Sequence, residues 1–158
     1  MRRKLSLGLG HCLDSCPKLS FFIMKKFEFF ETTADIGIIA YGRSLEELFE
    51  NAALAMFAVM CNVNKVKPGE RKEVKIKADG LESLLVQWLT SLLALRDIHG
   101  MMFSKFKVNI KNHELFGEAF GEETKEEHEL EVEVKAVTYH ELEIKKNDIW
   151  KARVILDI

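Results

Sequence analysis

Cysteine is scarce and unevenly placed in this sequence. The chain has three cysteines, Cys12, Cys16 and Cys61, and the first two lie close to its N-terminus. Small secreted domains held by disulfides carry a dense, even set of cysteines, and a structural zinc site needs four ligands at short spacings. The chain has neither pattern. The cysteine content therefore favours a reduced protein in the cytoplasm.

A large net charge is also missing. The 23 Lys and Arg residues nearly balance the 25 Asp and Glu residues, which leaves a formal net charge of -2. Because no overall positive field attracts a nucleic-acid backbone, we expect no direct binding of nucleic acid. With 47% hydrophobic and 30% charged residues, the 158-residue chain has the composition of one soluble globular domain.

The N-terminal segment lacks the uninterrupted apolar stretch of a signal peptide. Asp14 and Lys18 break the first 23 residues where about 7–15 consecutive apolar residues would be needed. Met24 then opens a stretch that is typical of the start of a small cytosolic protein. We therefore expect residues 1–23 to be a tail or a misassigned upstream start, residues 24–158 to form the domain, and no membrane to be involved.

The usual catalytic motifs are absent as well. No Gly-x-Ser-x-Gly elbow occurs, Gly8-Leu9-Gly10 lacks a third glycine, and no lysine follows a phosphate-binding glycine loop. Four histidines share no ligand spacing and are interpreted as surface or hydrogen-bonded core residues: His99, His113, His128 and His140. We therefore expect no catalytic residues and no nucleotide site.

Two helices are predicted by apolar periodicity. Ser44 and Glu47 form a capping box, and apolar residues at spacings of three and four follow from Leu45 to Met56, which predicts a helix that buries one face. A longer apolar pattern from Leu81 to Leu93, ended by Gly100, predicts a second helix.

The remaining regular segments are strand-like. Alternating or β-rich runs occur at residues 27–30, 36–41, 74–78, 106–110, 115–120, 130–136, 142–144 and 150–156. Strands and helices alternate at first and only strands follow. The order predicts a single α+β domain of two layers, with both helices packed on one face of a mixed β-sheet.

Two acidic residues stand out by position. Asp35 lies where a turn enters an apolar strand, and Asp157 lies at the end of another, beside the terminal residue Ile158. Each acid can be a simple cap or surface residue. Alternatively, both meet at one sheet edge together with the terminal carboxylate, and three crowded carboxylates would then require a hard cation such as Ca²⁺ or Mg²⁺.

Four segments carry a resemblance to a known family. They are Thr33–Ile38, Tyr41-Gly42, Lys135–His140 and the closing Trp150–Ile158, with Leu84-Leu85 and Trp88-Leu89 of the second helix between them. In this order they resemble the archease family, over about six-sevenths of the chain. The family motif His-Thr-Ala-Asp has Thr32 here in place of its histidine, whereas the aspartate is intact.

The resemblance implies a function and a site. Archeases activate the RtcB-type RNA ligase of tRNA splicing by promoting its guanylylation and repeated turnover, so the protein is expected to be an activator and not an enzyme. By similarity, Asp35, Asp157 and Ile158 would bind Ca²⁺, with Mg²⁺ as the alternative ion. Lys135 would be a functional neighbour, or else an ordinary exposed strand lysine. The alternative functions are a chaperone-like protein-binding module and a metal-dependent hydrolase.

Overall fold

The computed structural model describes residues 25–158, so the predicted tail lies outside the described residues. The elements, in chain order, are β1 (Phe27–Glu31), β2 (Ile36–Gly42), α3 (Leu45–Met60), the 3-10 turn η1 (Val63–Lys65), β3 (Glu70–Lys77), α4 (Leu81–His99), β4 (Met101–Lys111), β5 (Glu114–Glu123), the 3-10 turn η2 (Glu126–His128), β6 (Ala136–Lys146) and β7 (Trp150–Asp157). Neither described helix is long and apolar enough to cross a membrane.

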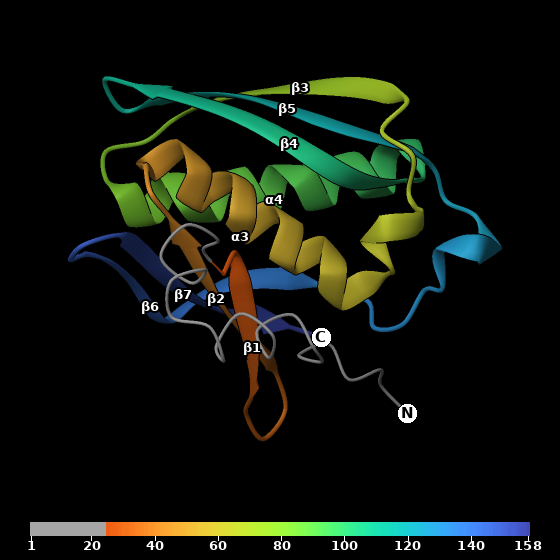
Figure 1. Cartoon of the computed structure of the whole chain (residues 1–158), viewed down its shortest axis with the longest axis horizontal. Coiled ribbons are helices and arrows are strands. Elements are labelled where there is room, and N and C mark those ends of the chain that lie inside the picture. Colours follow the sequence, from red (N-terminus) through yellow and green to blue (C-terminus); the bar gives the residue numbers. More distant parts are fainter. Residues whose placement is uncertain (1–24) are drawn as a thin grey trace, which may run out of the picture.

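The strands form two separate antiparallel sheets. One sheet has the order β1-β2-β7-β6 and the other the order β3-β5-β4. The helices lie between them (Figure 1), because α3 packs against β2 and β4 while α4 packs against β6 and β3. The α+β class, the two helices and the single domain are confirmed. The arrangement of both helices on one face of a single mixed sheet is wrong in detail.

The apolar surface of α3 explains this difference. The periodic stripe from Leu45 to Met56 predicts one buried face, yet Ala55, Phe57 and Ala58 on other sides of the helix are buried as well. A helix that is apolar around most of its circumference must be covered from more than one side. The second sheet supplies this cover.

Both predicted helix ends are confirmed. The Ser44 hydroxyl accepts a hydrogen bond from the Glu47 N–H at 3.1 Å, while the Glu47 carboxylate accepts from the Arg43 N–H at 2.6 Å. These contacts satisfy N–H groups at the start of α3. At the end of α4, Gly100 adopts φ = 63°, the left-handed conformation that glycine takes without a steric penalty.

The predicted strand at residues 130–136 is wrong except for its last residue, since β6 begins at Ala136. Two residues of the preceding segment, Glu131 and Val134, bond to the helix layer instead of pairing in a sheet. The Glu131 N–H donates to the Met60 carbonyl at 2.9 Å, and the Arg96 guanidinium donates to the Val134 carbonyl at 3.0 Å. Val134 is fully buried and Val132 is half-buried, whereas Leu130 is exposed, so only the last two apolar residues of the predicted strand pack against the core.

At Gly117 the three-stranded sheet packs directly against the Trp88 side chain of α4. A Cβ atom on Gly117 would lie 2.3 Å from the indole ring of Trp88, which is fully buried. The Trp88 ring also donates its N–H to the Phe49 carbonyl at 3.1 Å, so it cannot move without losing that bond. The missing side chain at position 117 lets the sheet and both helices pack together.

Gly117→Ala is expected to lower the free energy of unfolding by about 1–3 kcal/mol, the usual cost of overpacking a dense core. Gly69→Ala is the matched control because a Cβ there meets nothing within 4 Å. The control should stay within about 0.5 kcal/mol of wild type. Urea unfolding of both variants measures the difference, and equal stabilities would contradict the packing role of Gly117.

Candidate functional site

Strand register brings the predicted site residues to one end of the four-stranded sheet. Ile36 of β2 pairs with Leu156 of β7, and Ala136 of β6 pairs with Asp157. Asp35 immediately precedes the first of these residues, and Lys135 immediately precedes Ala136. We call Asp35, Asp157 and Ile158, together with Lys135, the acidic sheet end.

The backbone of Asp35 is held by Thr32. The Thr32 hydroxyl accepts a hydrogen bond from the Asp35 N–H at 3.0 Å, and the Thr32 N–H donates to the Asp35 carbonyl at 3.2 Å. Such hydroxyl-to-backbone bonds close short turns. Thr32, which stands where the archease motif has histidine, therefore fixes the turn that presents Asp35. This role was not predicted from the sequence.

Lys135 contributes to the acidic sheet end through its backbone. Its N–H donates to the Asp157 carbonyl at 2.7 Å, which holds the last residue of β7 beside the start of β6. Its side chain is exposed. The structure thus places Lys135 next to Asp157, while the function of its ammonium group stays a prediction.

The donor groups at this end suit a hard cation. Asp35 is half-buried and Asp157 is exposed, and within residues 25–158 neither carboxylate forms an ion pair. Ca²⁺ takes 6–8 oxygen ligands and tolerates irregular geometry, so water can complete its shell at an exposed site. Mg²⁺ demands a stricter octahedron. The residues fit Ca²⁺, and binding itself stays a prediction.

A second cluster lies away from the acidic sheet end. Ligand atoms of Glu122, Glu127 and His128 all lie within 4.8 Å of one another. His128 is fully buried, its Nδ1 accepts from the Lys125 N–H at 3.1 Å, and its Nε2 lies 2.9 Å from Glu122. Because Nδ1 is an acceptor, Nε2 carries the proton and donates it to Glu122.

This cluster is structural. Both ring nitrogens of His128 are engaged, so neither offers a free lone pair to a metal. The His128 carbonyl also accepts from the Asn62 N–H at 2.8 Å, which ties η2 to the segment after α3. The sequence interpretation leaves surface and hydrogen-bonded core positions open for the histidines, and His128 is a hydrogen-bonded core residue. Its partners were not predicted because no spacing motif joins them.

The Glu122 carboxylate accepts three hydrogen bonds. The donors are the Lys67 N–H at 2.9 Å, the His128 ring and the Lys125 ammonium at 3.1 Å. These bonds favour the ionised form and lower the pKa of Glu122 from 4.5 to about 2, with the Lys67 N–H contributing most. Glu122 therefore joins the segments that follow α3 and β5.

Comparison with known proteins shows similarity along almost all of the described chain. Residues 27–158 match the model of the Archease protein family (MTH1598/TM1083). The protein named archease from Methanothermobacter thermautotrophicus is 52% identical over 140 residues, covering 85% of this chain and 100% of the relative. The archease of Sulfurisphaera tokodaii is 52% identical over 139 residues, with the same coverage.

Two solved structures are also similar. The solution structure of Methanobacterium thermoautotrophicum protein 1598 is 52% identical with a TM-score of 0.76, and the match covers 85% of this chain and 100% of that one. The crystal structure of an archease from Thermotoga maritima, described as a possible chaperone, is 23% identical with a TM-score of 0.58, covering 82% and 94%. The second likeness concerns the fold alone.

Glu122→Gln is expected to destabilise the protein at neutral pH, because the folded state then loses its ionised acceptor. The carboxylate's pKa is lower in the folded chain, so its contribution is complete above pH 4.5 and is lost as the pH falls towards 2. The stability difference between wild type and variant should therefore narrow below about pH 4.5. Urea unfolding at a series of pH values measures it.

The exposed Glu126 supplies the control, since Glu126→Gln removes the same charge. This control should stay within about 0.5 kcal/mol of wild type at every pH. A Glu122→Gln difference that does not change with pH would contradict the assigned role of the carboxylate.

Proposed function

The chain belongs to the archease family, and from this premise we propose that it activates an RtcB-type RNA ligase. In this proposal the ligase performs the chemistry, and the protein promotes its guanylylation and repeated turnover. The observation that carries the proposal is the family match over residues 27–158, with the Thr-Ala-Asp motif intact. The protein itself is proposed to have no catalytic residue.

The acidic sheet end is the proposed contact region for the ligase. Asp35, Asp157 and Ile158 would hold Ca²⁺, Ile158 through its carboxylate or carbonyl oxygen. The ion would neutralise acidic groups that otherwise repel one another and would make their arrangement rigid. Thr32 and the Lys135 backbone already fix the two chain segments involved. Lys135 would add an exposed cation at the rim.

The observations favour an activator over the two alternatives. A chaperone-like module needs a contiguous exposed apolar patch. The large exposed apolar residues of the described chain come from separate segments: Ile98, Phe116, Leu130 and Tyr139. A metal-dependent hydrolase needs a general base near its metal, and His128, the buried histidine, is committed to Glu122.

A ligation assay tests the proposal. Purified ligase at limiting concentration, Mn²⁺, GTP and RNA halves with a 3′-phosphate and a 5′-hydroxyl are combined with or without this protein. The protein alone is incubated with the same RNA. Multiple turnovers are expected only in the combination. Ligation or cleavage by the protein alone would contradict the proposal, as would a ligase unaffected by it.

Asp35→Asn and Asp157→Asn are expected to abolish stabilisation by Ca²⁺. A ligand present at about 100 times its dissociation constant adds roughly 2.7 kcal/mol to the folded state. Wild type should therefore melt at a higher temperature in Ca²⁺ than in EDTA, and neither variant should. Thermal unfolding in the absence of ligase measures this response.

Asp148→Asn is the matched control, since Asp148 is exposed and lies in the turn before β7, at the end opposite Asp157. It should retain the full response to Ca²⁺. An equal response of all three variants would place the ion elsewhere. If millimolar Ca²⁺ does not change the melting temperature of the wild type, the proposed Ca²⁺ site is wrong.

Lys135→Ala should separate stability from activation. The hydrogen bond to Asp157 comes from the backbone and survives the substitution, so the free energy of unfolding should change by less than about 0.5 kcal/mol. If the exposed ammonium contacts the ligase, the concentration needed for half-maximal stimulation should rise roughly tenfold, about 1.4 kcal/mol. Titration of the ligation assay measures it. Lys151→Ala is the control, and equal behaviour of both variants would make Lys135 an ordinary surface lysine.

A further inference from the structure

The outer face of the three-stranded sheet is open to solvent. Side chains alternate across each of its strands, so that Ile76, Val108 and Leu115 are buried towards the helices while their neighbours point outward. The helices cover only the inner side of this sheet (Figure 1). We call the outward-pointing side the open face.

The open face carries basic and aromatic residues together. Its side chains are Arg71, Glu73, Lys75 and Lys77 from β3, Glu114, Phe116, Glu118 and Phe120 from β5, and Lys105, Lys107, Asn109 and Lys111 from β4. The open face thus carries six basic residues and three glutamates, although the whole chain has a net charge of -2. The near-neutral total conceals a local positive surface.

The two aromatic rings lie on the central strand, between the cations of its neighbours. Lys75 Nζ lies 5.2 Å from the centre of the Phe116 ring, and Lys105 Nζ lies 5.6 Å from that of Phe120. Phe116 is 46% exposed. The rings are four residues apart on one face, which corresponds to about 14 Å along the strand.

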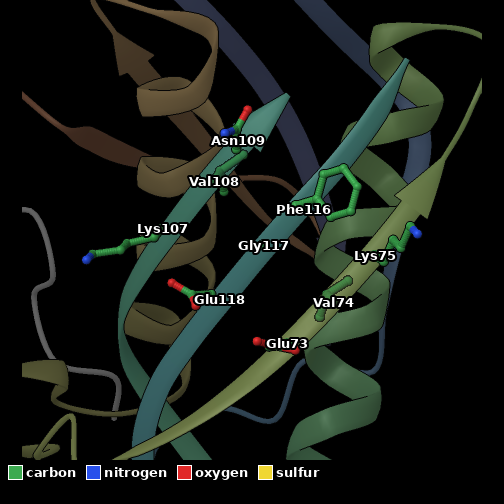
Figure 2. A pocket seen from close by; sticks show the side chains of 9 residues that line it. All are labelled: Glu73, Val74, Lys75, Lys107, Val108, Asn109, Phe116, Gly117 and Glu118. Carbon is green, nitrogen blue, oxygen red and sulfur yellow. The ribbon is translucent and has the colours of Figure 1, made fainter. Parts of the chain in front are cut away.

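A hollow opens beside Phe116. Its volume is about 670 Å³, within the usual range of ligand pockets. The backbone row of Val74, Gly117 and Val108 forms its floor, since these three residues pair across the sheet and their side chains do not point outward. Figure 2 shows Lys75 and Lys107 extending from opposite sides of this hollow, with Phe116 between them.

Among the described residues, the lysines on this face contact aromatic rings or solvent but form no ion pairs. Arg71 is occupied by ion pairs with Glu73, at 2.6 Å, and Glu118. The five lysines at positions 75, 77, 105, 107 and 111 form no ion pair with a carboxylate in residues 25–158. Apart from Arg71 and its two glutamate partners, the charged residues of the open face are five lysines and Glu114. The face is complementary to a polyanion.

We propose that the open face binds single-stranded RNA. The lysines would contact phosphates, and Phe116 and Phe120 would each stack on a base. Asn109 lines the hollow beside Phe116 and offers an amide to a 2′-hydroxyl, the group that distinguishes RNA from DNA. Such binding differs from the expectation raised by the net charge, and it does not depend on the proposed ligase function.

The energies allow a base to take the place of a lysine on the ring. An exposed cation–π contact is worth about 0.5–1 kcal/mol. Stacking of a base on an aromatic side chain is worth about 1–3 kcal/mol. A base therefore displaces the ammonium of Lys75 from Phe116, and the released charge pairs with a phosphate. An acidic peptide would gain the charge contacts but no stacking, which favours RNA as the partner.

Fluorescence anisotropy with the full chain tests this proposal. The probe is a labelled oligo(U) RNA of about 12 nucleotides, within the site size of small single-strand-binding folds. Ligase is omitted and EDTA is present, so that the result does not depend on the acidic sheet end. If four or five lysines contact phosphates, raising the salt from about 50 to 200 mM should weaken binding roughly 50- to 130-fold.

Substitution by leucine isolates the stacking. Phe116→Leu and Phe120→Leu keep an apolar side chain and remove the aromatic ring, and each should weaken RNA binding roughly 5- to 150-fold. Tyr139→Leu on β6 is the matched control, since Tyr139 is 59% exposed on the other sheet. It should bind as wild type does. Circular dichroism and urea unfolding verify that each variant is folded.

Substitution by glutamine isolates the charges. Lys75→Gln and Lys107→Gln should each reduce the slope of log affinity against log salt by about 0.7, the value for one phosphate contact on a single strand. Lys151→Gln on β7, also exposed, should leave the slope unchanged. Equal loss from Lys151→Gln would show a non-specific attraction and would overturn the assignment to this face.

Three further outcomes would overturn the proposal. The first is the absence of RNA binding by wild type at low salt. The second is equally effective displacement of the RNA by poly-glutamate at the same charge concentration, which would mean that the face is only an electrostatic surface or a site for an acidic protein. The third is DNA of the same length, as oligo(dU), binding as tightly as the RNA. Tighter binding of RNA than of either competitor supports it.

Discussion

The architecture depends on the need to cover α3 from two sides. Most of its circumference is apolar, with Phe49, Met56 and Phe57 fully buried, and one sheet cannot remove all of that surface from water. The second sheet completes the cover, and the indole of Trp88 joins the two helices by its bond to the Phe49 carbonyl. Within residues 25–158 the helices therefore form a central layer between the two sheets.

The two sheets differ in the chemistry that they present. The four-stranded sheet brings two aspartates and the chain end to one edge, whereas the open face of the three-stranded sheet gathers lysines around two phenyl rings. The net charge of -2 of the whole chain shows neither of these local surfaces. A protein proposed to assist an RNA ligase could thus contact the enzyme and the RNA with different surfaces, and the helix layer between them keeps the surfaces apart.

Much of the candidate site could be predicted from sequence because its residues lie in short motifs. Asp35 follows Thr33-Ala34, and Asp157 ends an apolar strand, so each was identified by its neighbours. Their juxtaposition depends on the antiparallel register of β2, β6 and β7, which no local pattern specifies. The turn-closing role of Thr32 and the Glu122–His128 pair depend on such contacts too, and they were missed for that reason.

The sequence by itself determined the local features: the helix that begins after Ser44, the left-handed end at Gly100, the strand alternation and the family. These follow from interactions among neighbouring residues or from the order of the motifs along the chain. Tertiary structure decided that the strands form two sheets, that Glu131 and Val134 bond to the helix layer, and that basic residues gather on one face of the three-stranded sheet. Those outcomes depend on which strands pair and which faces are covered. Composition counts residues regardless of their position in the fold, so it specifies neither.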